Sequence, residues 1–182
     1  MVFYIIMAVI ILLIIYILFL YNSFVSLSNK VKEAFSTMDV YLKKRWDLIS
    51  NLVETVKGYA EHEKETFSEV TKLRNNNYEE MSTDEKIAVN EKMTNNVDKI
   101  MALKESYPDL KANTNFKDLS EQLKKLEDDI ANSRKYYNAV VRIYNNKVEM
   151  FPNNLVAKIL GYKPKAMFEA TSEERNNVKV EL

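Results

Sequence analysis

Apolar residues along the first 74 positions predict one long helix that changes character along its length. Residues 1–21 contain no charged side chain. After them, apolar residues recur three or four positions apart, which is typical of one helix face. These residues are Val31, Phe35, Met38, Leu42, Ile49, Leu52, Val56, Tyr59 and Val70. The pattern predicts a helix from Met1 to about Arg74 that begins as a membrane span and continues as the core of a bundle.

The next part of the chain predicts a second helix and a loop. Ser82, followed by acidic residues at positions 84 and 85, is a typical helix start, because the hydroxyl caps backbone N–H groups and acids stabilise the first turn. Pro108 is expected to close this helix, and residues 107–115 are expected to form a loop.

A third helix and a short fourth helix follow. Apolar positions from Phe116 to Val148 predict a helix over about 114–150, which ends before Pro152. Asn153 or Asn154 is expected to cap the short helix, with Gly161 in the left-handed conformation just past its end. The tail is expected to be extended or mobile.

Together these elements predict an all-α protein: a transmembrane helix continuous with an antiparallel bundle of three long helices and one short C-terminal helix. Two glycines and three prolines are too few for the turns of a multi-stranded sheet. We expect an up-down-up bundle in which the first and third helices run parallel. The predicted parts are a span over 1–21, a membrane-proximal neck over 22–44, a bundle core over 45–162 and a tail over 163–182.

The uncharged segment 1–21 has the length of a single span. At 1.5 Å per residue it is about 31 Å long, against a hydrocarbon core of about 30 Å. It lacks the basic start and small-residue site of a cleaved signal peptide. Lys and Arg follow the span and none precedes it, which predicts a cytoplasmic soluble part. Tyr4, Tyr16 and Tyr21 are expected to anchor the span at the membrane interfaces.

Helix lengths predict that the neck lacks an internal partner. The first helix beyond the membrane measures about 78 Å and the third about 55 Å, which leaves roughly 20 Å uncovered. This piece still carries an apolar surface that water should not be left to cover. Its residues are Phe24, Leu27, Val31, Phe35 and Met38. We therefore expect homo-oligomerisation through the neck.

Composition disfavours most chemistry. The chain has no cysteine and one histidine, His62, so too few side chains are present to complete a zinc site. A serine nucleophile would need His62 as its general base. No glycine-rich phosphate loop is present. With 26 basic and 26 acidic residues, no overall field attracts nucleic acid. We expect no enzyme activity, no cofactor, no metal and no nucleic-acid partner.

Arg45 occupies a position at which the apolar stripe of the first helix predicts an apolar residue. Either its guanidinium enters the bundle and recognises a ligand or partner, or the stripe has drifted and Arg45 extends to solvent beside Asp47. We favour the second interpretation. The carboxylates around Glu127 are most simply a solvated face.

Gly58 in a helix interior predicts a close neighbour. Parallel first and third helices would bring Gly58 and Tyr59 to the level of the tyrosines on the third helix. We expect a seam with buried asparagines that could hold a small ligand, although aromatics at this spacing are more often core. The predicted seam residues are Arg45, Gly58, Tyr59, Tyr136, Tyr137, Asn138 and Tyr144, with Asn51 and Asn145 as further candidates.

Between Arg134 and Lys165 seven basic residues face one acid, Glu149. In the expected topology this basic end lies far from the anchor. It is a candidate docking surface for an acidic protein partner, although ordinary solvated lysines are the simpler interpretation.

Two blocks resemble the LemA family over nearly the whole chain. The first runs from Asn22 to Ala60 and includes Val31-Lys32-Glu33-Ala34-Phe35-Ser36 and Arg45-Trp46-Asp47-Leu48-Ile49. The second includes Tyr136-Tyr137-Asn138, Phe151-Pro152-Asn153-Asn154-Leu155 and Gly161-Tyr162-Lys163-Pro164. The sequence departs at Ser50, where the family usually has proline. The resemblance implies a bacterial inner-membrane protein with one N-terminal anchor and a cytoplasmic four-helix bundle, and it implies no established activity.

The leading hypothesis is a membrane-anchored, non-enzymatic helical scaffold or adaptor that forms homo-oligomers. The alternative is a sensory or regulatory module, in which a ligand at the tyrosine-rich seam shifts the long helix.

Overall fold

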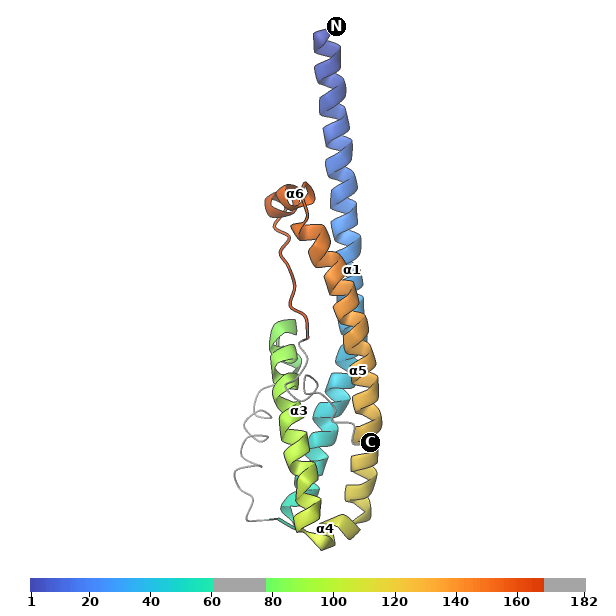
Figure 1. The fold of residues 1–182 in the computed structure, drawn as a ribbon, viewed down its shortest axis with the longest axis vertical. Helices are drawn as coiled ribbons and strands as arrows, with labels where there is room; N and C mark the ends of the chain where they lie inside the picture. Colours follow the sequence, from blue (N-terminus) through green and yellow to red (C-terminus); the bar gives the residue numbers. More distant parts are fainter. Residues whose placement is uncertain (61–77, 169–182) are drawn as a thin grey trace, which may run out of the picture. The chain divides into compact units, whose positions relative to one another are not determined.

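The computed structural model describes residues 1–60 and 78–168, whose regular elements are all helices (Figure 1). This confirms the all-α fold class and the long apolar first helix. The elements are α1 (Val2–Lys57), the 3-10 helix η1 (Tyr78–Glu80), α3 (Thr83–Ser106), α4 (Pro108–Ala112), α5 (Thr114–Glu149) and α6 (Asn153–Ile159).

The first helix, α1, ends earlier than the sequence predicts. Its last residue is Lys57, and the N–H groups of Tyr59 and Ala60 both donate to the carbonyl of Val56, at 2.9 and 3.0 Å. Gly58 therefore follows the helix, because glycine has the poorest helix propensity after proline. Its expected place in a helix interior is wrong. The remaining predicted stretch, from residue 61 to Arg74, lies outside the described residues.

The start of α3 is as predicted. The hydroxyl of Ser82 accepts from the N–H of Glu85 at 3.3 Å, and the Glu85 carboxylate accepts from the N–H of Ser82 at 2.8 Å. This reciprocal capping box satisfies two donors that a helix start leaves unpaired. Beyond α3, Pro108 opens the five-residue helix α4, because proline suits a first helical position. The predicted loop over 107–115 thus contains a helix.

The third long helix, α5, matches its prediction closely. Five of its buried side chains recur at seven-residue intervals, each at most 2 % exposed, as in a coiled-coil seam. They are Phe116, Leu123, Ile130, Tyr137 and Tyr144. Pro152, not an asparagine side chain, occupies the N-cap of α6. Gly161 has φ of 78°, the left-handed conformation expected after that helix.

The chain divides into two compact units, to both of which α1 and α5 contribute. Unit 1 comprises residues 1–36 and 134–167. Unit 2 comprises residues 37–133 and 168–182, of which the structure describes 37–60, 78–133 and Phe168.

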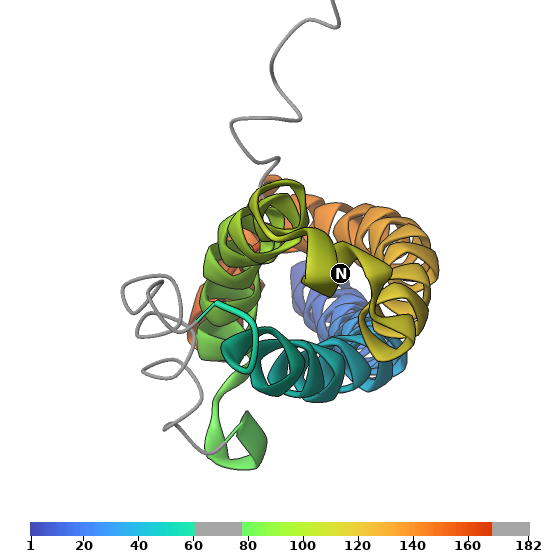
Figure 2. The ribbon, with the colours of Figure 1, turned by 90° about the horizontal axis from the view of Figure 1, so that it is seen from below.

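Within unit 2, α3 runs parallel to α1, and α5 runs antiparallel to both. Residues 39 and 45 of α1 contact residues 86 and 90 of α3 in the same order. Along α5 the order is reversed, since Arg45 contacts Glu127 and Tyr59 contacts Asn113 just before that helix. Ser120 of α5 also meets Met101 of α3, so all three pairs of helices touch (Figure 2).

The expected up-down-up order is therefore wrong. The physical reason is the early end of α1. Tyr78 lies beside Asp39, about 18 residues back along α1 from its end, so the chain returns roughly 27 Å before α3 begins.

Unit 1 contains the apolar start of α1. All side chains from Met1 to Phe19 are exposed, and Leu20 is the first buried one, at 1 %. The bare part of α1, residues 2–19, is about 27 Å long, close to a bilayer core. Among the described residues, α1 is the one helix long and apolar enough to cross a membrane.

The predicted neck is covered by the chain itself. Phe24 and Val31 are buried, and Leu27 and Phe35 are half-buried. The ring of Phe24 stacks on Tyr162 at 5.0 Å, and Phe35 meets Tyr137 edge-on at 5.8 Å. The expectation of an uncovered neck is wrong because the C-terminal half of α5 returns along it. In unit 2, Met38 is buried as well.

Candidate functional site

A buried arginine lies between the three helices of unit 2. Arg45 on α1 has no exposed surface, and its Nε lies 2.7 Å from the carboxylate of Glu127 on α5. Its other nitrogens donate to the hydroxyl of Thr94 at 3.0 Å and to the carbonyl of Asn90 at 3.3 Å, both on α3. The interpretation of Arg45 as solvent-directed is wrong, and Glu127 is more than a solvated acid. The guanidinium is recognised by the chain itself.

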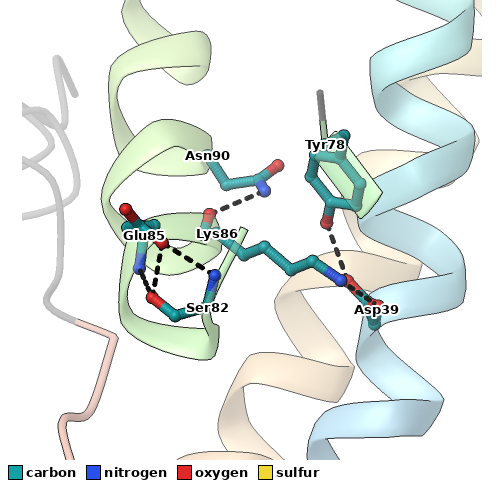
Figure 3. Close-up of polar contacts among 6 residues, drawn as sticks. All are labelled: Asp39, Tyr78, Ser82, Glu85, Lys86 and Asn90. Carbon is teal, nitrogen blue, oxygen red and sulfur yellow. Dashed lines mark hydrogen bonds and ion pairs between the residues drawn. The ribbon is translucent and has the colours of Figure 1, made fainter. Parts of the chain in front are cut away.

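A second polar cluster lies between α1 and the start of α3 (Figure 3). The carboxylate of Asp39 accepts from the hydroxyl of Tyr78 at 2.8 Å and from the ammonium of Lys86 at 2.7 Å. The ammonium also lies 4.8 Å from the centre of the Tyr78 ring. The ring centre of Trp46 is 5.2 Å from that of Tyr78. Asp39 thus fixes both η1 and the first turn of α3 to α1.

The electrostatics of this cluster favour a fixed structure over proton transfer. Burial raises the pKa of the Tyr78 hydroxyl above its usual 10, and the hydrogen bond to Asp39 and the charge of that carboxylate raise it further. Tyr78 therefore stays neutral and donates at any physiological pH. Paired charges of this kind specify which helices meet and in which register, as polar core residues do in coiled coils.

A third polar site, in unit 1, holds the chain that follows α6. The hydroxyls of Tyr137 and Tyr144 donate to the carbonyls of Ala166 and Lys163, at 3.1 and 3.0 Å. The amide of Asn145 donates to the carbonyl of Lys165 at 2.9 Å and accepts from its N–H at 2.8 Å. Residues 163–166 are therefore held in an extended conformation along α5, which is the first of the two expectations for the tail, extended or mobile.

These hydrogen bonds engage the hydroxyl groups of both tyrosines of this site. Burial, followed by the neighbouring Tyr162, raises the pKa of the Tyr144 hydroxyl above its usual value. Both hydroxyls donate to backbone carbonyls of the same chain. These donors are therefore already engaged at the place where the predicted seam would have bound a ligand. The prediction that Asn145 is satisfied by hydrogen bonds is confirmed.

The structure distributes the predicted seam residues over different places. Arg45 lies in the buried cluster of unit 2, and Tyr59 accepts a hydrogen bond from Asn113 at 2.8 Å. Gly58 is exposed after α1. Tyr137 packs on Phe35 in unit 1, next to the half-buried Asn138, whereas Tyr136 is 57 % exposed. The predicted contact between Gly58-Tyr59 and Tyr136-Tyr137 assumed parallel first and third helices, whereas α1 and α5 run antiparallel in unit 2. Asn51 is exposed.

The predicted interface tyrosines are all exposed, as membrane anchors would be. Tyr4 lies near the start of the bare helix, Tyr21 near its end, and Tyr16 donates to Asn153 of α6 at 3.2 Å.

The sequence did not predict a role in a polar cluster for Asp39, Tyr78, Lys86, Asn90 or Thr94. One signal was available for two of them. Ile87, Asn90, Thr94 and Val97 follow one another at three- or four-residue steps, so Asn90 and Thr94 are polar residues on an otherwise apolar stripe. Asp39 and Lys86 carried no such signal.

The described residues hold no group of three or more metal-ligating side chains. His62, the one histidine, lies outside the described residues. Unit 2 also carries an open groove of about 500 Å³ between α1 and α5. It is lined by Lys44, Asp47, Leu48, Asn51, Gln122, Lys125, Leu126 and Asp129.

The basic stretch from Arg134 to Lys165 lies in unit 1, together with the apolar start of α1. The prediction that this stretch lies far from the anchor is wrong, because α5 runs antiparallel to α1. Its predicted use as a docking surface for an acidic protein rested on that distance.

A bare apolar helix, followed by a helical bundle whose largely apolar core holds one buried ion pair, is typical of a helical protein associated with a membrane through its N-terminal helix. The profile of the LemA family matches residues 34–182, so the chain belongs to the LemA family.

Two kinds of relatives are similar to this chain. Protein LemA of Metamycoplasma hominis is 29 % identical over 154 residues, which cover 82 % of this chain and 69 % of the relative. Magnetosome protein MamQ 2 of Paramagnetospirillum magneticum is 25 % identical over 175 residues, and MamQ of Magnetospirillum gryphiswaldense is 24 % identical over 169. The matches span 64 % and 62 % of these magnetosome proteins, a little under two thirds of their length.

Proposed function

We propose that this protein is a non-enzymatic scaffold of the LemA type, which holds a rigid helical bundle at the cytoplasmic face of the bacterial inner membrane. The observation that carries the proposal is α1 itself, one uninterrupted helix from the bare apolar residues to the buried core of unit 2. The paired charges of Asp39 and Arg45 then fix the other helices to it. The membrane span and the buried residues of the bundle thus belong to one continuous helix.

We infer the cytoplasmic location from the Lys and Arg residues that follow the span. Because the chain has no cysteine, a single Val40→Cys variant reports orientation without background. Val40 is 55 % exposed in unit 2. We expect a membrane-impermeant thiol reagent to label it in permeabilised cells and not in intact spheroplasts. Labelling in intact spheroplasts would place the bundle outside and contradict the proposal.

The scaffold role is tested by crosslinking and pull-down of the full-length protein from native membranes. We expect a reproducible set of partners that is lost in a copy lacking residues 1–21, because the anchor sets the location of the bundle. The same set captured by the truncated copy would mean that membrane presentation plays no part.

Homo-oligomerisation belongs to the proposal, but not through the neck, whose apolar residues are buried or half-buried within one chain. The exposed apolar side chains of α5 offer a better surface. Tyr136 and Ile143 on α5, and Met150 just after its end, recur at seven-residue steps and are 57, 55 and 62 % exposed. Such spacing suits helix pairing between copies. We expect Ile143→Glu to reduce the mass of the full-length protein in mild detergent, measured by light scattering, and Val40→Glu to leave it unchanged.

The groove of unit 2 favours a second candidate function, a sensory or regulatory module. Its walls carry Lys44 and Lys125 as well as Asp47 and Asp129, which suits a small polar ligand with both charges. A ligand bound between α1 and α5 would act on the helix that enters the membrane. A compound that raises the melting temperature of the wild type, but not of Lys125→Ala, would support this function over a pure scaffold.

A further inference from the structure

The short helix α6 lies beside the end of the membrane span. The hydroxyl of Tyr16 donates to the side chain of Asn153, the first residue of α6, at 3.2 Å. Two turns later on α1, Phe24 stacks on Tyr162, just after α6. Leu20, between these two contacts, is buried. Both ends of α6 are therefore tied to the stretch of α1 where the bare helix ends (Figure 1).

The outward face of α6 is strongly apolar. Phe151, Leu155 and Ile159 recur every four residues and are 78, 57 and 84 % exposed, whereas Ala157 is buried. Exposed apolar side chains also flank the helix on both sides. They are Met150 and Leu160, just before and just after it. A contiguous patch of this kind on a water-exposed surface marks a binding surface for an apolar partner.

The charge of unit 1 identifies that partner. Its residues include nine Lys and Arg against two Glu, which gives a net charge of +7. The whole chain is neutral, so the remaining residues carry −7. Lys158 and Lys163, within and just after α6, are both exposed. An apolar stripe with adjacent lysines is the pattern of a helix that lies in the interface of an anionic bilayer.

We propose that α6 is a second membrane contact, which lies in the interface of the same bilayer that α1 spans. Phe151, Leu155 and Ile159 enter the acyl boundary, and Lys158 and Lys163 meet anionic headgroups. The inference rests on the membrane anchor in the proposed function and not on the scaffold role. Its consequence is orientational: a single span can tilt and rotate in a bilayer, whereas a helix fixed to its side and held in the interface limits the tilt and rotation of that span.

The experiment uses single tryptophans in the full-length protein, reconstituted into vesicles of phosphatidylcholine and phosphatidylglycerol that contain brominated lipid. Trp46, the one native tryptophan, is replaced by phenylalanine. The test variants are Phe151→Trp and Ile159→Trp. Leu12→Trp, on the bare helix, is the control inside the bilayer, and Val40→Trp, exposed in unit 2, is the control in water.

We expect blue-shifted emission from both test variants, quenched more by bromines near the headgroups than by bromines near the bilayer centre. Leu12→Trp should show the opposite depth preference and Val40→Trp no quenching. Replacing phosphatidylglycerol by phosphatidylcholine should reduce the quenching of Phe151→Trp, and Lys158→Gln with Lys163→Gln should remove that lipid dependence.

Two results would overturn the inference. If Leu12→Trp is quenched while the two test variants behave like Val40→Trp, α6 faces water and only the anchor stands. If Leu12→Trp is not quenched, the anchor is not in the bilayer and both proposals fail. Should Trp46→Phe unfold the protein, Ile159→Cys with an environment-sensitive fluorophore gives the same answer with Trp46 in place, since a water-like emission there contradicts the inference.

Discussion

Arg45 provides the most direct test of the structure, because the sequence favoured a solvent-directed side chain and the structure buries it. Arg45→Ala removes the ion pair to Glu127 and the bonds to Thr94 and Asn90. Breaking a buried ion pair costs about 3–5 kcal/mol. The carboxylate left behind is 36 % exposed, so water solvates it and the cost falls in the lower part of that range. We expect a loss of about 3 kcal/mol in the free energy of unfolding.

The measurement is urea or thermal unfolding of the full-length protein in mild detergent, followed by circular dichroism. For a chain of this length, about 3 kcal/mol corresponds to a fall in Tm of roughly 10 °C. Lys44→Ala is the matched control, since Lys44 is the exposed neighbour and a surface change of this kind stays within about 0.5 kcal/mol. A fall in Tm no larger than that of the control would show that the guanidinium extends to solvent.

A double-mutant cycle separates the charge interaction from the loss of volume. Arg45→Met keeps most of the side-chain volume, and Glu127→Gln removes the carboxylate charge. If the pair acts directly, the two changes together should cost at least about 1 kcal/mol less than the sum of the single changes, within the range seen for contacting residues. Additive effects would mean that Arg45 stabilises unit 2 by packing alone.

Three further predictions concern the caps, the tail and the tyrosine of unit 2. Ser82→Ala should destabilise α3 by about 1 kcal/mol. Hydrogen bonds from Ser82 lower the pKa of Glu85. The difference in the free energy of unfolding between Ser82→Ala and wild type should therefore be largest at neutral pH and shrink as acid protonates that carboxylate. An equal difference in the free energy of unfolding at low pH would contradict the capping box. Asn145→Ala loses both bonds to Lys165, about 2 kcal/mol in total, and should speed amide exchange over 162–168, with Asn146→Ala as the exposed control. The pKa of Tyr78 is raised, so its contribution to the free energy of unfolding is complete below pH 10 and is lost as the pH rises further. Tyr78→Phe should therefore lose less stability than wild type above pH 10. An equal loss of stability above pH 10 in both proteins would mean that other groups cause it.

The sequence by itself determined the three long helices, except for the end of α1, and an apolar segment long enough to span a membrane. A 21-residue uncharged segment has few alternatives to a membrane helix, and seven-residue spacing from Phe116 to Tyr144 specifies a buried stripe whichever helix lies opposite. The Ser82 start and the Gly161 turn were also readable, because a cap and a left-handed glycine act on their own local backbone.

The tertiary structure decided which helices meet and in which direction. Periodicity shows that a helix has an apolar face, but it does not show what covers that face. Because α1 ends early, at Lys57, α3 and α5 run in the directions opposite to those predicted. The apolar residues of the neck are therefore buried or half-buried, and the basic stretch lies in the same unit as the anchor. The partners of Arg45 could not be predicted for the same reason: Glu127 lies 82 positions away in the chain, and only helix packing brings its carboxylate to the guanidinium.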